Sequence, residues 1–385
     1  MFSKRTTFLN KSATLAMNAL SKERQKQGLP VFNLSTGEPD LPTPEHIKSA
    51  AKEAIDQNFT QYTAAGGIPE LKQAIQLKFK RDNGLDFTLP EITTANGGKQ
   101  ILYNLFQVLL DEGDEVLCFS PYWLSYRTQV ELAGAKLIEI GCENFKPRAE
   151  KLIEAIGPKC KIILINSPAN PSGAIIDEAD LKLIGKAVLG KNIMIVSDEV
   201  YEFFYYTSEK PKGILELMPE LKAQTIIVNS VSKSYAMTGW RLGYAAGPAE
   251  IIDKMEELQG HSSSNASSIS QKASIAALAG PQDAIEMMRQ KFIARRQKLI
   301  EKFSAPAAKI KLIVPEGAFY ALLDVSKLLN EHENTLDFCM KLISETGVVA
   351  VPGSPFGENM EKFIRISFAV KDDVLESALE ALGKL

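Results

Sequence analysis

Residues 224–246 read QTIIVNSVSKSYAMTGWRLGYAA, in which two apolar runs flank a polar turn that carries a single lysine. The runs at residues 224–229 and 241–246 have the length and β-branched or aromatic content of buried strands. Four further candidate strands, separated by helical patterns, lie upstream at residues 91–94, 115–119, 161–166 and 192–197. This alternation is typical of an α/β fold, in which helices cover both faces of a mainly parallel sheet.

The chain beyond residue 284 follows a different pattern. Residues 284–303 form one helical pattern without a breaker, which can link two units. Shorter candidate strands follow at residues 310–314, 318–325, 348–351 and 363–368, with a final helix from residue 371. The first forty residues predict a helix at 12–27 and a strand at 31–34, and residues 261–270 predict a loop. We therefore expect a large domain at 41–283 and a small α+β domain built from 1–40 and 284–385.

Composition limits the classes of partner. A chain of 385 residues with 45% apolar and 24% charged residues is expected to fold as two packed units. The net charge of -3 and the lack of long like-charge runs argue against nucleic acid and membrane surfaces, which leaves small molecules. The four cysteines are scattered and no metal-ligand spacing is present, so we expect no metal and a reducing, cytoplasmic compartment. Neither a signal peptide nor a membrane-spanning stretch is predicted.

Polar residues follow the predicted strands, where open parallel sheets bind their ligands. After the first strand, Gly97, Gly98 and Lys99 open a helix whose free N–H groups can hold a phosphate, although a tight turn alone would also need glycine. Trp123 follows the second strand and can stack on an aromatic cofactor or be a half-buried core residue. Asn170 lies in a Pro-rich turn after the third strand.

The last two strand ends supply an acid and an amine. Asp198 emerges from an apolar run after the fourth strand, so its carboxylate needs a partner or a shifted pKa, and Tyr201 follows it. Lys233 leaves the sheet after the fifth strand, and Arg241 follows eight residues later. Alone, Lys233 would be read as a solvated surface amine. An amine, an acid, a tyrosine, an asparagine and a phosphate turn are together the parts that pyridoxal 5'-phosphate (PLP) needs.

Several motifs carry a resemblance to a known family. The segment S-x-S-K at Lys233 with T-G-W-R-L-G-Y after it, S-T-G-E-P-D at Gly37 and F-I-R-I-S-F at Arg365 resemble class I/II aminotransferases of PLP fold type I. The resemblance runs over nearly the whole chain. G-G-K-Q at Lys99 and S-P-Y-W at Trp123 are similar to the bacterial aspartate aminotransferase branch that includes bifunctional aspartate/prephenate enzymes. Two departures, Ala266 after the Asn and Ser172 for Thr, do not touch the chemistry.

The resemblance implies a seven-stranded sheet, a homodimer with shared sites and a role for each matching residue. Lys233 would hold PLP as a Schiff base and carry the proton, Asp198 would face the pyridine nitrogen, and Tyr201 with Asn170 would face the ring oxygen. The other implied cofactor residues are Gly98, Lys99, Trp123, Ser230, Ser232 and Arg241, with Tyr62 from a second subunit. The implied substrate residues are Gly37, Thr14, Lys99, Trp123, Asn170 and Arg365, of which Arg365 would fork onto the α-carboxylate.

The implied reaction moves an amino group between aspartate or glutamate and a 2-oxo acid by ping-pong chemistry. The alternatives within PLP enzymes are a prephenate, aromatic or broad-specificity aminotransferase, a lyase, and a non-catalytic PLP-binding regulator. A regulator would normally carry a fused basic DNA-binding domain. A dehydrogenase would need G-x-G-x-x-G after a strand and a hydrolase G-x-S-x-G with a histidine, and neither motif is present.

Overall fold

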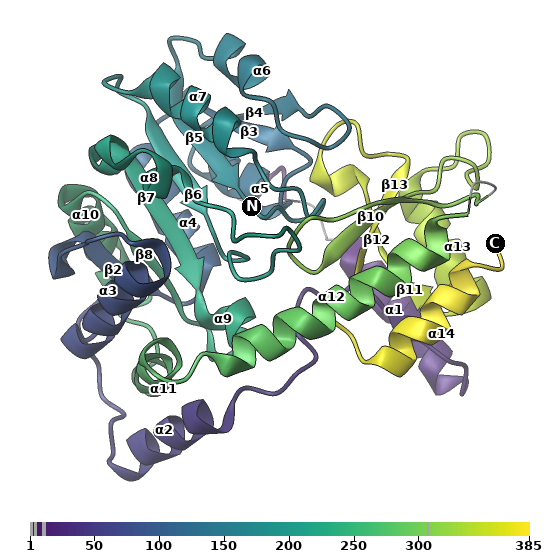
Figure 1. Ribbon diagram of the computed structural model, residues 1–385, viewed down its shortest axis with the longest axis horizontal. Helices are drawn as coiled ribbons and strands as arrows, with labels where there is room; N and C mark the ends of the chain where they lie inside the picture. Colours follow the sequence, from purple (N-terminus) through teal and green to yellow (C-terminus); the bar gives the residue numbers. More distant parts are fainter. Residues whose placement is uncertain (1–2, 4–5, 10–12, 306–307) are drawn as a thin grey trace.

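The computed structural model describes residues 3, 6–9, 13–305 and 308–385 (Figure 1). Its larger sheet has seven strands in the order β2-β8-β7-β6-β5-β3-β4. They are β2 (Ile92–Ala95), β3 (Glu115–Ser120), β4 (Lys136–Gly141), β5 (Cys160–Asn166), β6 (Met194–Asp198), β7 (Thr225–Ser230) and β8 (Gly243–Ala246). β8 runs opposite to the other six strands, so the sheet is mainly parallel, as predicted.

The larger sheet is buried on both faces, which explains why its strands are apolar without alternation. Ile163 and Ile165 of β5 pack into one hydrophobic core, whereas Ile162 and Leu164 pack into another. The surrounding helices are α2 (Glu45–Asp56), α3 (Pro69–Asn83), α4 (Gly98–Leu109), α5 (Ser125–Leu132), α6 (Ala149–Glu154), α7 (Glu178–Val188), α8 (Ile214–Leu217), α10 (Ala249–Gly260) and α11 (Ser268–Ala279). The strand ends are therefore left as the place where polar side chains gather.

A smaller sheet has the order β12-β13-β10-β9 and is antiparallel. Its strands are β9 (Lys311–Ile313), β10 (Tyr320–Asp324), β12 (Val351–Pro352) and β13 (Phe363–Ser367), and β1 (Phe32–Asn33) pairs separately with β11 (Val348–Val349). Helices α1 (Ala13–Lys26), α13 (Thr335–Thr346) and α14 (Asp372–Leu382) pack around them. The beginning and the end of the chain thus share one hydrophobic core.

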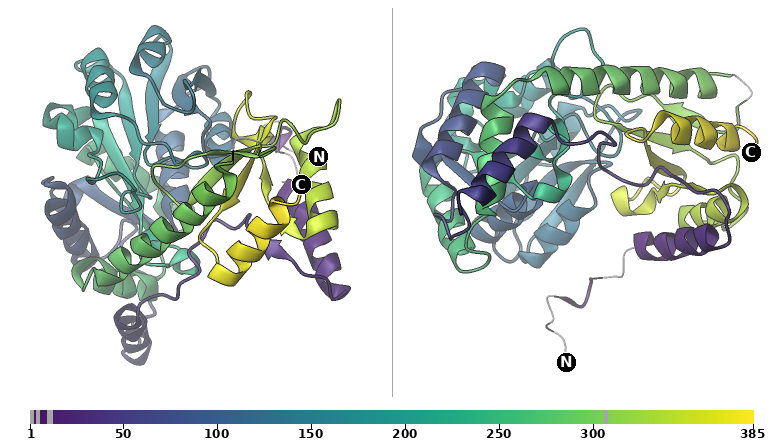
Figure 2. Two further views of the ribbon diagram at one scale, coloured as in Figure 1. Left: turned by 45° about the vertical axis from the view of Figure 1, so that its right-hand side comes forward. Right: turned by 90° about the horizontal axis from the view of Figure 1, so that it is seen from below.

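The long helix α12 (Asp283–Phe303) links the two sheets, as the sequence predicts. Figures 1 and 2 show it running from beside α11 to the smaller sheet. Arg295 lies buried in its middle and donates to Asp40 at 2.7 and 2.9 Å and to Asp372 at 3.0 Å. This guanidinium therefore ties the segment before α2 and the start of α14 to the same helix.

The predicted elements are confirmed with shifted ends. All six predicted strands of the larger sheet exist, but β4 was missed. The predicted strand at 348–351 is split at Ala350 into β11 and β12, which belong to different sheets. The predicted loop at 261–270 ends earlier, because Ser267 caps α11 by accepting from the Ser270 N–H at 3.4 Å.

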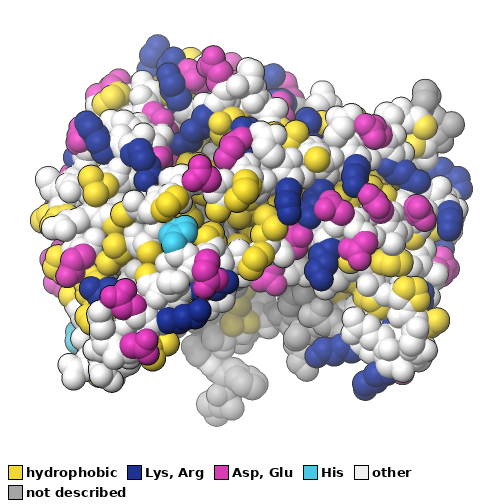
Figure 3. All heavy atoms as spheres, turned by 60° about the horizontal axis from the view of Figure 1, so that its bottom comes forward, with side chains coloured by type: hydrophobic (Ala, Val, Ile, Leu, Met, Phe, Trp, Pro, Cys, Tyr) yellow, Lys and Arg dark blue, Asp and Glu magenta, His cyan; other side chains and the backbone are white. Residues whose placement is uncertain are grey.

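The surface is mixed in charge on the face that Figure 3 shows. Lys and Arg side chains are interspersed there with Asp and Glu, and hydrophobic side chains are exposed between them. Among the residues that the structure describes, no helix is long and apolar enough to span a membrane.

Candidate active site

A cavity of about 420 Å³ lies where the carboxyl ends of β5, β6 and β7 meet the smaller sheet. Twelve predicted cofactor or substrate residues line it: Gly37, Gly98, Lys99, Trp123, Asn170, Asp198, Tyr201, Ser230, Ser232, Lys233, Arg241 and Arg365. The topology explains this assembly, because adjacent parallel strands end at the same edge of the sheet. The chain segments that meet there are far apart in sequence, from Gly37 to Arg365.

Lys233 lies in the one-turn helix α9 (Val231–Ser234), which follows β7 without a loop. Ser230 caps this turn, because its Oγ accepts from the Ser232 N–H at 3.0 Å. The Lys233 Nζ donates to the Gly37 carbonyl oxygen at 2.6 Å, so the amine points into the cavity. Burial lowers the pKa of Lys233 to about 8, with Glu38 opposing the shift and Arg241 adding to it. A substantial fraction of this amine is therefore neutral near physiological pH.

Asp198 is the last residue of β6 and is buried beneath the same cavity. The Tyr126 hydroxyl donates to its Oδ2 at 2.6 Å and the Val200 N–H to its Oδ1 at 3.3 Å. Burial raises the pKa of Asp198 to about 6, although both hydrogen bonds and the charge of Lys233 favour the ionised form. A cationic group bound beside Asp198 would lower this pKa again and so stabilise the ionised carboxylate.

Arg365 of β13 faces the cavity from the smaller sheet. Its Nη1 donates to Asn170 Oδ1 at 3.1 Å and its Nη2 to the Ser35 carbonyl oxygen at 2.9 Å. The guanidinium carbon lies 4.5 Å from the centroid of the Tyr320 ring. Its buried Nε has no hydrogen-bond partner among the described residues. A buried donor without an acceptor is costly, so this guanidinium is suited to an anionic ligand.

A tyrosine pair lies between the two sheets. The hydroxyls of Tyr201 and Tyr320 are 3.1 Å apart, and their rings meet edge to face. Burial raises the pKa of the Tyr201 phenol well above its ordinary value. Tyr201 is therefore a neutral hydroxyl that can donate a hydrogen bond in the cavity.

The turn at the start of α4 forms a cradle for an anion. Gly97 has φ 88°, and a Cβ there would lie 2.4 Å from Arg241 Nη2. A Cβ on Gly243 would lie 2.2 Å from the backbone nitrogen of Gly98. Glycine is therefore required at both positions. The free N–H groups of α4, the Arg241 guanidinium and the hydroxyls of Ser230 and Ser232 together suit a phosphate.

Lys99 and Trp123 form the remaining wall. The Lys99 Nζ lies 4.9 Å from the centroid of the Trp123 ring, which meets Tyr126 edge to face. Burial, together with the charge of Arg241, lowers the pKa of Lys99. No carboxylate influences the pKa of Lys99 in the described ranges. Beside Arg241 and Arg365, Lys99 is thus a further cation of the cavity without an acidic partner among the described residues.

One predicted site residue lies outside this assembly, and the side chain of another is not among those described. Tyr62 does not line the cavity and its side chain is 88% exposed. Thr14 lies in α1, but its side chain is not among those that the structure describes. The sequence analysis missed Tyr126, Tyr320 and Ser35. Tyr126 has a weak signal, since it lies three residues beyond Trp123 in the same segment. Ser35 directly follows the strand predicted at 31–34 and opens the S-T-G-E-P-D motif, whereas Tyr320 lies inside a strand.

The comparisons agree with this geometry. Residues 30–382 match the family of aminotransferases of class I and II. The chain belongs to this family. The aspartate aminotransferase of Geobacillus stearothermophilus is 45% identical over 386 residues, which cover 99% of this chain and 98% of that protein. The aspartate/prephenate aminotransferase of Thermus thermophilus is 38% identical over 391 residues, covering 100% and 98%.

Solved structures of aminotransferases confirm the predicted fold type I. The structure of the aspartate aminotransferase from Rhizobium meliloti superimposes with a TM-score of 0.94 at 40% identity, covering 100% of this chain and 98% of that one. The enzyme is a PLP-dependent aminotransferase. Its cavity fits the cofactor, since the glycine cradle suits the phosphate and the buried Asp198 suits the ring nitrogen.

Proposed function

We propose that this aminotransferase exchanges amino groups between aspartate or glutamate and the corresponding 2-oxo acids, oxaloacetate and 2-oxoglutarate. One observation carries the proposal: Lys99 and Arg365 both line the cavity, and neither has a carboxylate partner among the described residues. With Arg241 assigned to the phosphate, these two cations match a substrate with two carboxylates, whose burial without partners would be costly. The relatives that are called aspartate aminotransferases support the same substrate class.

The residue roles form part of this proposal. Bound PLP supplies an electron-withdrawing ring that stabilises negative charge on the substrate Cα. Asp198 keeps the ring nitrogen protonated, and Tyr201 with Asn170 holds the ring oxygen. Lys233 binds the cofactor through its amine and then moves the proton at the substrate Cα, for which a pKa of about 8 is well matched.

The anchoring residues hold the two ends of the reactants. Gly98, Ser230, Ser232 and Arg241 hold the phosphate, together with the backbone of Lys99. Arg365 forks onto the substrate α-carboxylate, for which its planar donors suit two carboxylate oxygens. The Lys99 side chain binds the distal carboxylate, with Trp123 beneath the amine. The resemblance implies that Thr14 also takes part in binding the substrate.

A homodimer with shared sites is also part of the proposal. The exposed Tyr62 lies in an open hollow of about 810 Å³ with Thr60, Gln61, Ser263 and Asn265. A tyrosine so exposed suits a role at a second subunit, where it would complete the phosphate site. We also infer a large domain at 41–283, a small one from 1–40 and 284–385, and a cytoplasmic location.

Prephenate is the second candidate amino acceptor. Relatives that are called aspartate/prephenate aminotransferases match over nearly their full length. Prephenate also carries a second carboxylate, so the same lysine would bind it.

The substrate proposal is tested with Lys99→Ala. A charge-assisted hydrogen bond contributes about 1.5–3 kcal/mol, so kcat/KM for aspartate should fall about ten- to a hundredfold. The half-reaction with a neutral amino donor should change much less. Lys182→Ala serves as the control, because Lys182 is a helical surface lysine of α7 that pairs with Glu178 away from the cavity. Equal losses for acidic and neutral donors would assign Lys99 to the cofactor or the fold instead.

A further inference from the structure

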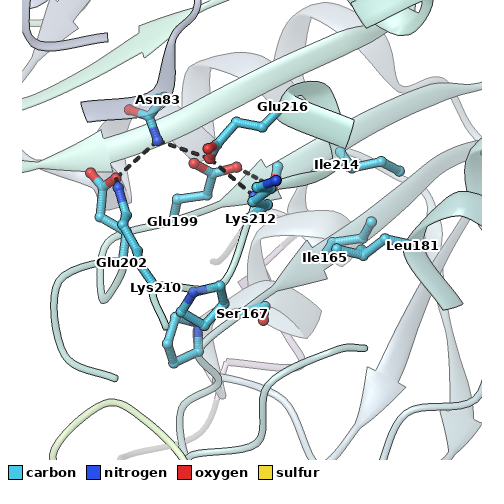
Figure 4. Close-up of a pocket in the computed structure, with 14 residues that line it drawn as sticks. Asn83, Ile165, Ser167, Leu181, Glu199, Glu202, Lys210, Lys212, Ile214 and Glu216 are labelled. Carbon is cyan, nitrogen blue, oxygen red and sulfur yellow. Dashed lines mark hydrogen bonds and ion pairs between the residues drawn. The ribbon is translucent and has the colours of Figure 1, made fainter. Parts of the chain in front are cut away.

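A second cluster of charged residues lies buried outside the cavity, beside a small hollow of about 20 Å³. At its centre is Glu202, one residue after Tyr201, with a side chain that is 6% exposed. Lys78 of α3 is fully buried against it, and Lys210 pairs with it at 3.1 Å. Figure 4 shows Asn83 between Glu202 and Glu216, with its amide nitrogen bonded to both. None of these side chains lines the active-site cavity.

Glu202 uses both carboxylate oxygens. Its Oε1 accepts from Lys78 and from the Asn229 amide at 2.6 Å, and its Oε2 accepts from Lys210 and from the Asn83 amide at 3.2 Å. Burial alone would raise its pKa, but the charges of Lys78 and Lys210 hold the pKa of Glu202 at about 2. The carboxylate is therefore ionised at any pH at which the enzyme works, and it can only accept hydrogen bonds.

Asn229 connects this cluster to the active site. Because a carboxylate cannot donate, Glu202 fixes the Asn229 amide with its Nδ2 toward the cluster. The Asn229 Oδ1 then accepts from the Ser230 N–H at 2.7 Å. The Ser230 Oγ in turn accepts from the Ser232 N–H at 3.0 Å and lies 2.7 Å from the Ser232 Oγ. The hydrogen bonds from the buried carboxylate thus reach the backbone of Ser230, whose hydroxyl bonds Ser232 and lies 2.8 Å from the Leu242 carbonyl oxygen.

Stability alone does not explain an ion cluster in this place. Buried ion pairs are often no more stable than apolar residues of the same volume, because desolvation offsets their attraction. This cluster also fixes the orientation of the Asn229 side-chain amide. Through that amide it holds the backbone of the turn between β7 and α9.

We propose that Glu202, acting through Asn229, is a positioning residue that holds the Ser230–Ser232 turn in the conformation that binds the cofactor phosphate. This inference rests on the proposed phosphate role of Ser230 and Ser232. It assigns to Glu202 no contact with cofactor or substrate.

The test compares binding of PLP with binding of pyridoxal, which lacks the phosphate, to the full-length apoprotein in phosphate-free buffer. Glu202→Gln keeps the side-chain volume but removes the charge and one acceptor. Asn229→Ala removes the link and leaves Glu202 paired with both lysines, so it tests the same idea if the first variant does not fold. The matched control is Glu216→Gln, because Glu216 bonds the same Asn83 at 3.0 Å and has no recorded contact with Asn229.

Glu202→Gln and Asn229→Ala should each weaken PLP binding about tenfold, which corresponds to the loss of about one hydrogen bond. Pyridoxal binding should change less than about twofold, and Glu216→Gln should bind both compounds as the unmodified protein does. Equal losses for PLP and pyridoxal, or unaltered PLP binding in both variants, would overturn the inference. Ser230→Ala distinguishes a failure of the proposed Glu202 role from a failure of the proposed phosphate site. If this variant also binds PLP normally, the proposed phosphate site is itself wrong.

Discussion

The site predicts an unusually low pKa for the Lys233 amine in the cofactor-free protein, and this pKa can be measured. Its pKa of about 8, against an ordinary value near 10.5, results from burial, from Arg241 and from other nearby cations. At pH 7.5 a pKa of 8 leaves about 24% of the amine neutral, whereas a pKa of 10.5 leaves about 0.1%. Lys233 should therefore react with electrophiles faster at this pH than an ordinary lysine of equal access, by less than the ratio of the two fractions, because a less basic amine is also a weaker nucleophile.

Trace labelling of the apoprotein with acetic anhydride measures this directly. The labelled Lys233 peptide is quantified by mass spectrometry between pH 6 and pH 11, with a lysine-containing model peptide in the same solution as the internal standard. Its reactivity should rise with pH and level off above about 8. Glu38→Gln removes the negative charge that raises this pKa, so the midpoint should move to lower pH. A midpoint near 10.5 in the unmodified protein would refute the claim that burial lowers the pKa of Lys233.

Three further changes test other parts of the structure. Tyr126→Phe removes a 2.6 Å bond to Asp198, so the pKa of that carboxyl should rise by about one to two units and the acid limb of the kcat/KM profile should move to higher pH. An unmoved limb would contradict the electrostatic role of Tyr126. Co-expressed Lys233→Ala and Tyr62→Ala chains should regain activity in mixed dimers if the sites are shared, whereas additive loss would argue against sharing. Arg295→Ala should lower the free energy of unfolding by about 3 kcal/mol in urea titrations, because two acidic partners lose their cation. A change below about 0.5 kcal/mol would show that this bridge contributes little.

Local patterns were sufficient to predict most of the larger sheet. Strands buried on both faces read as uninterrupted apolar runs, and β7 is buried at every residue. The missed strand β4 lies at the edge of the sheet, and Glu139 interrupts the apolar residues of its sequence KLIEIG. β4 therefore lacks the uninterrupted apolar run that marks a strand buried on both faces.

The sequence could predict a site residue only if that residue follows a strand or belongs to a recognisable motif. Asp198 and Lys233 each follow an apolar run, and ligands of open parallel sheets bind where the strands end, so both residues could be predicted. Tyr320 lies inside β10 and reaches the cavity only because the smaller sheet packs across the ends of the larger one. Its bond to Tyr201 joins residues 119 positions apart, and no local pattern encodes such a contact.

The segment from Asp198 to Glu202 shows how one turn can serve two opposed electrostatic needs. Asp198 and Tyr201 face the cavity, whereas Glu199 and Glu202 lie in the buried cluster behind it. On the cavity side, burial raises the pKa of Asp198 to about 6, so the charge of this carboxyl group can change near neutral pH. On the other side, two lysines hold Glu202 at about 2, so its charge does not change while the cavity groups titrate. A fixed charge can therefore keep the neighbouring turn in place while the cavity groups change their ionisation.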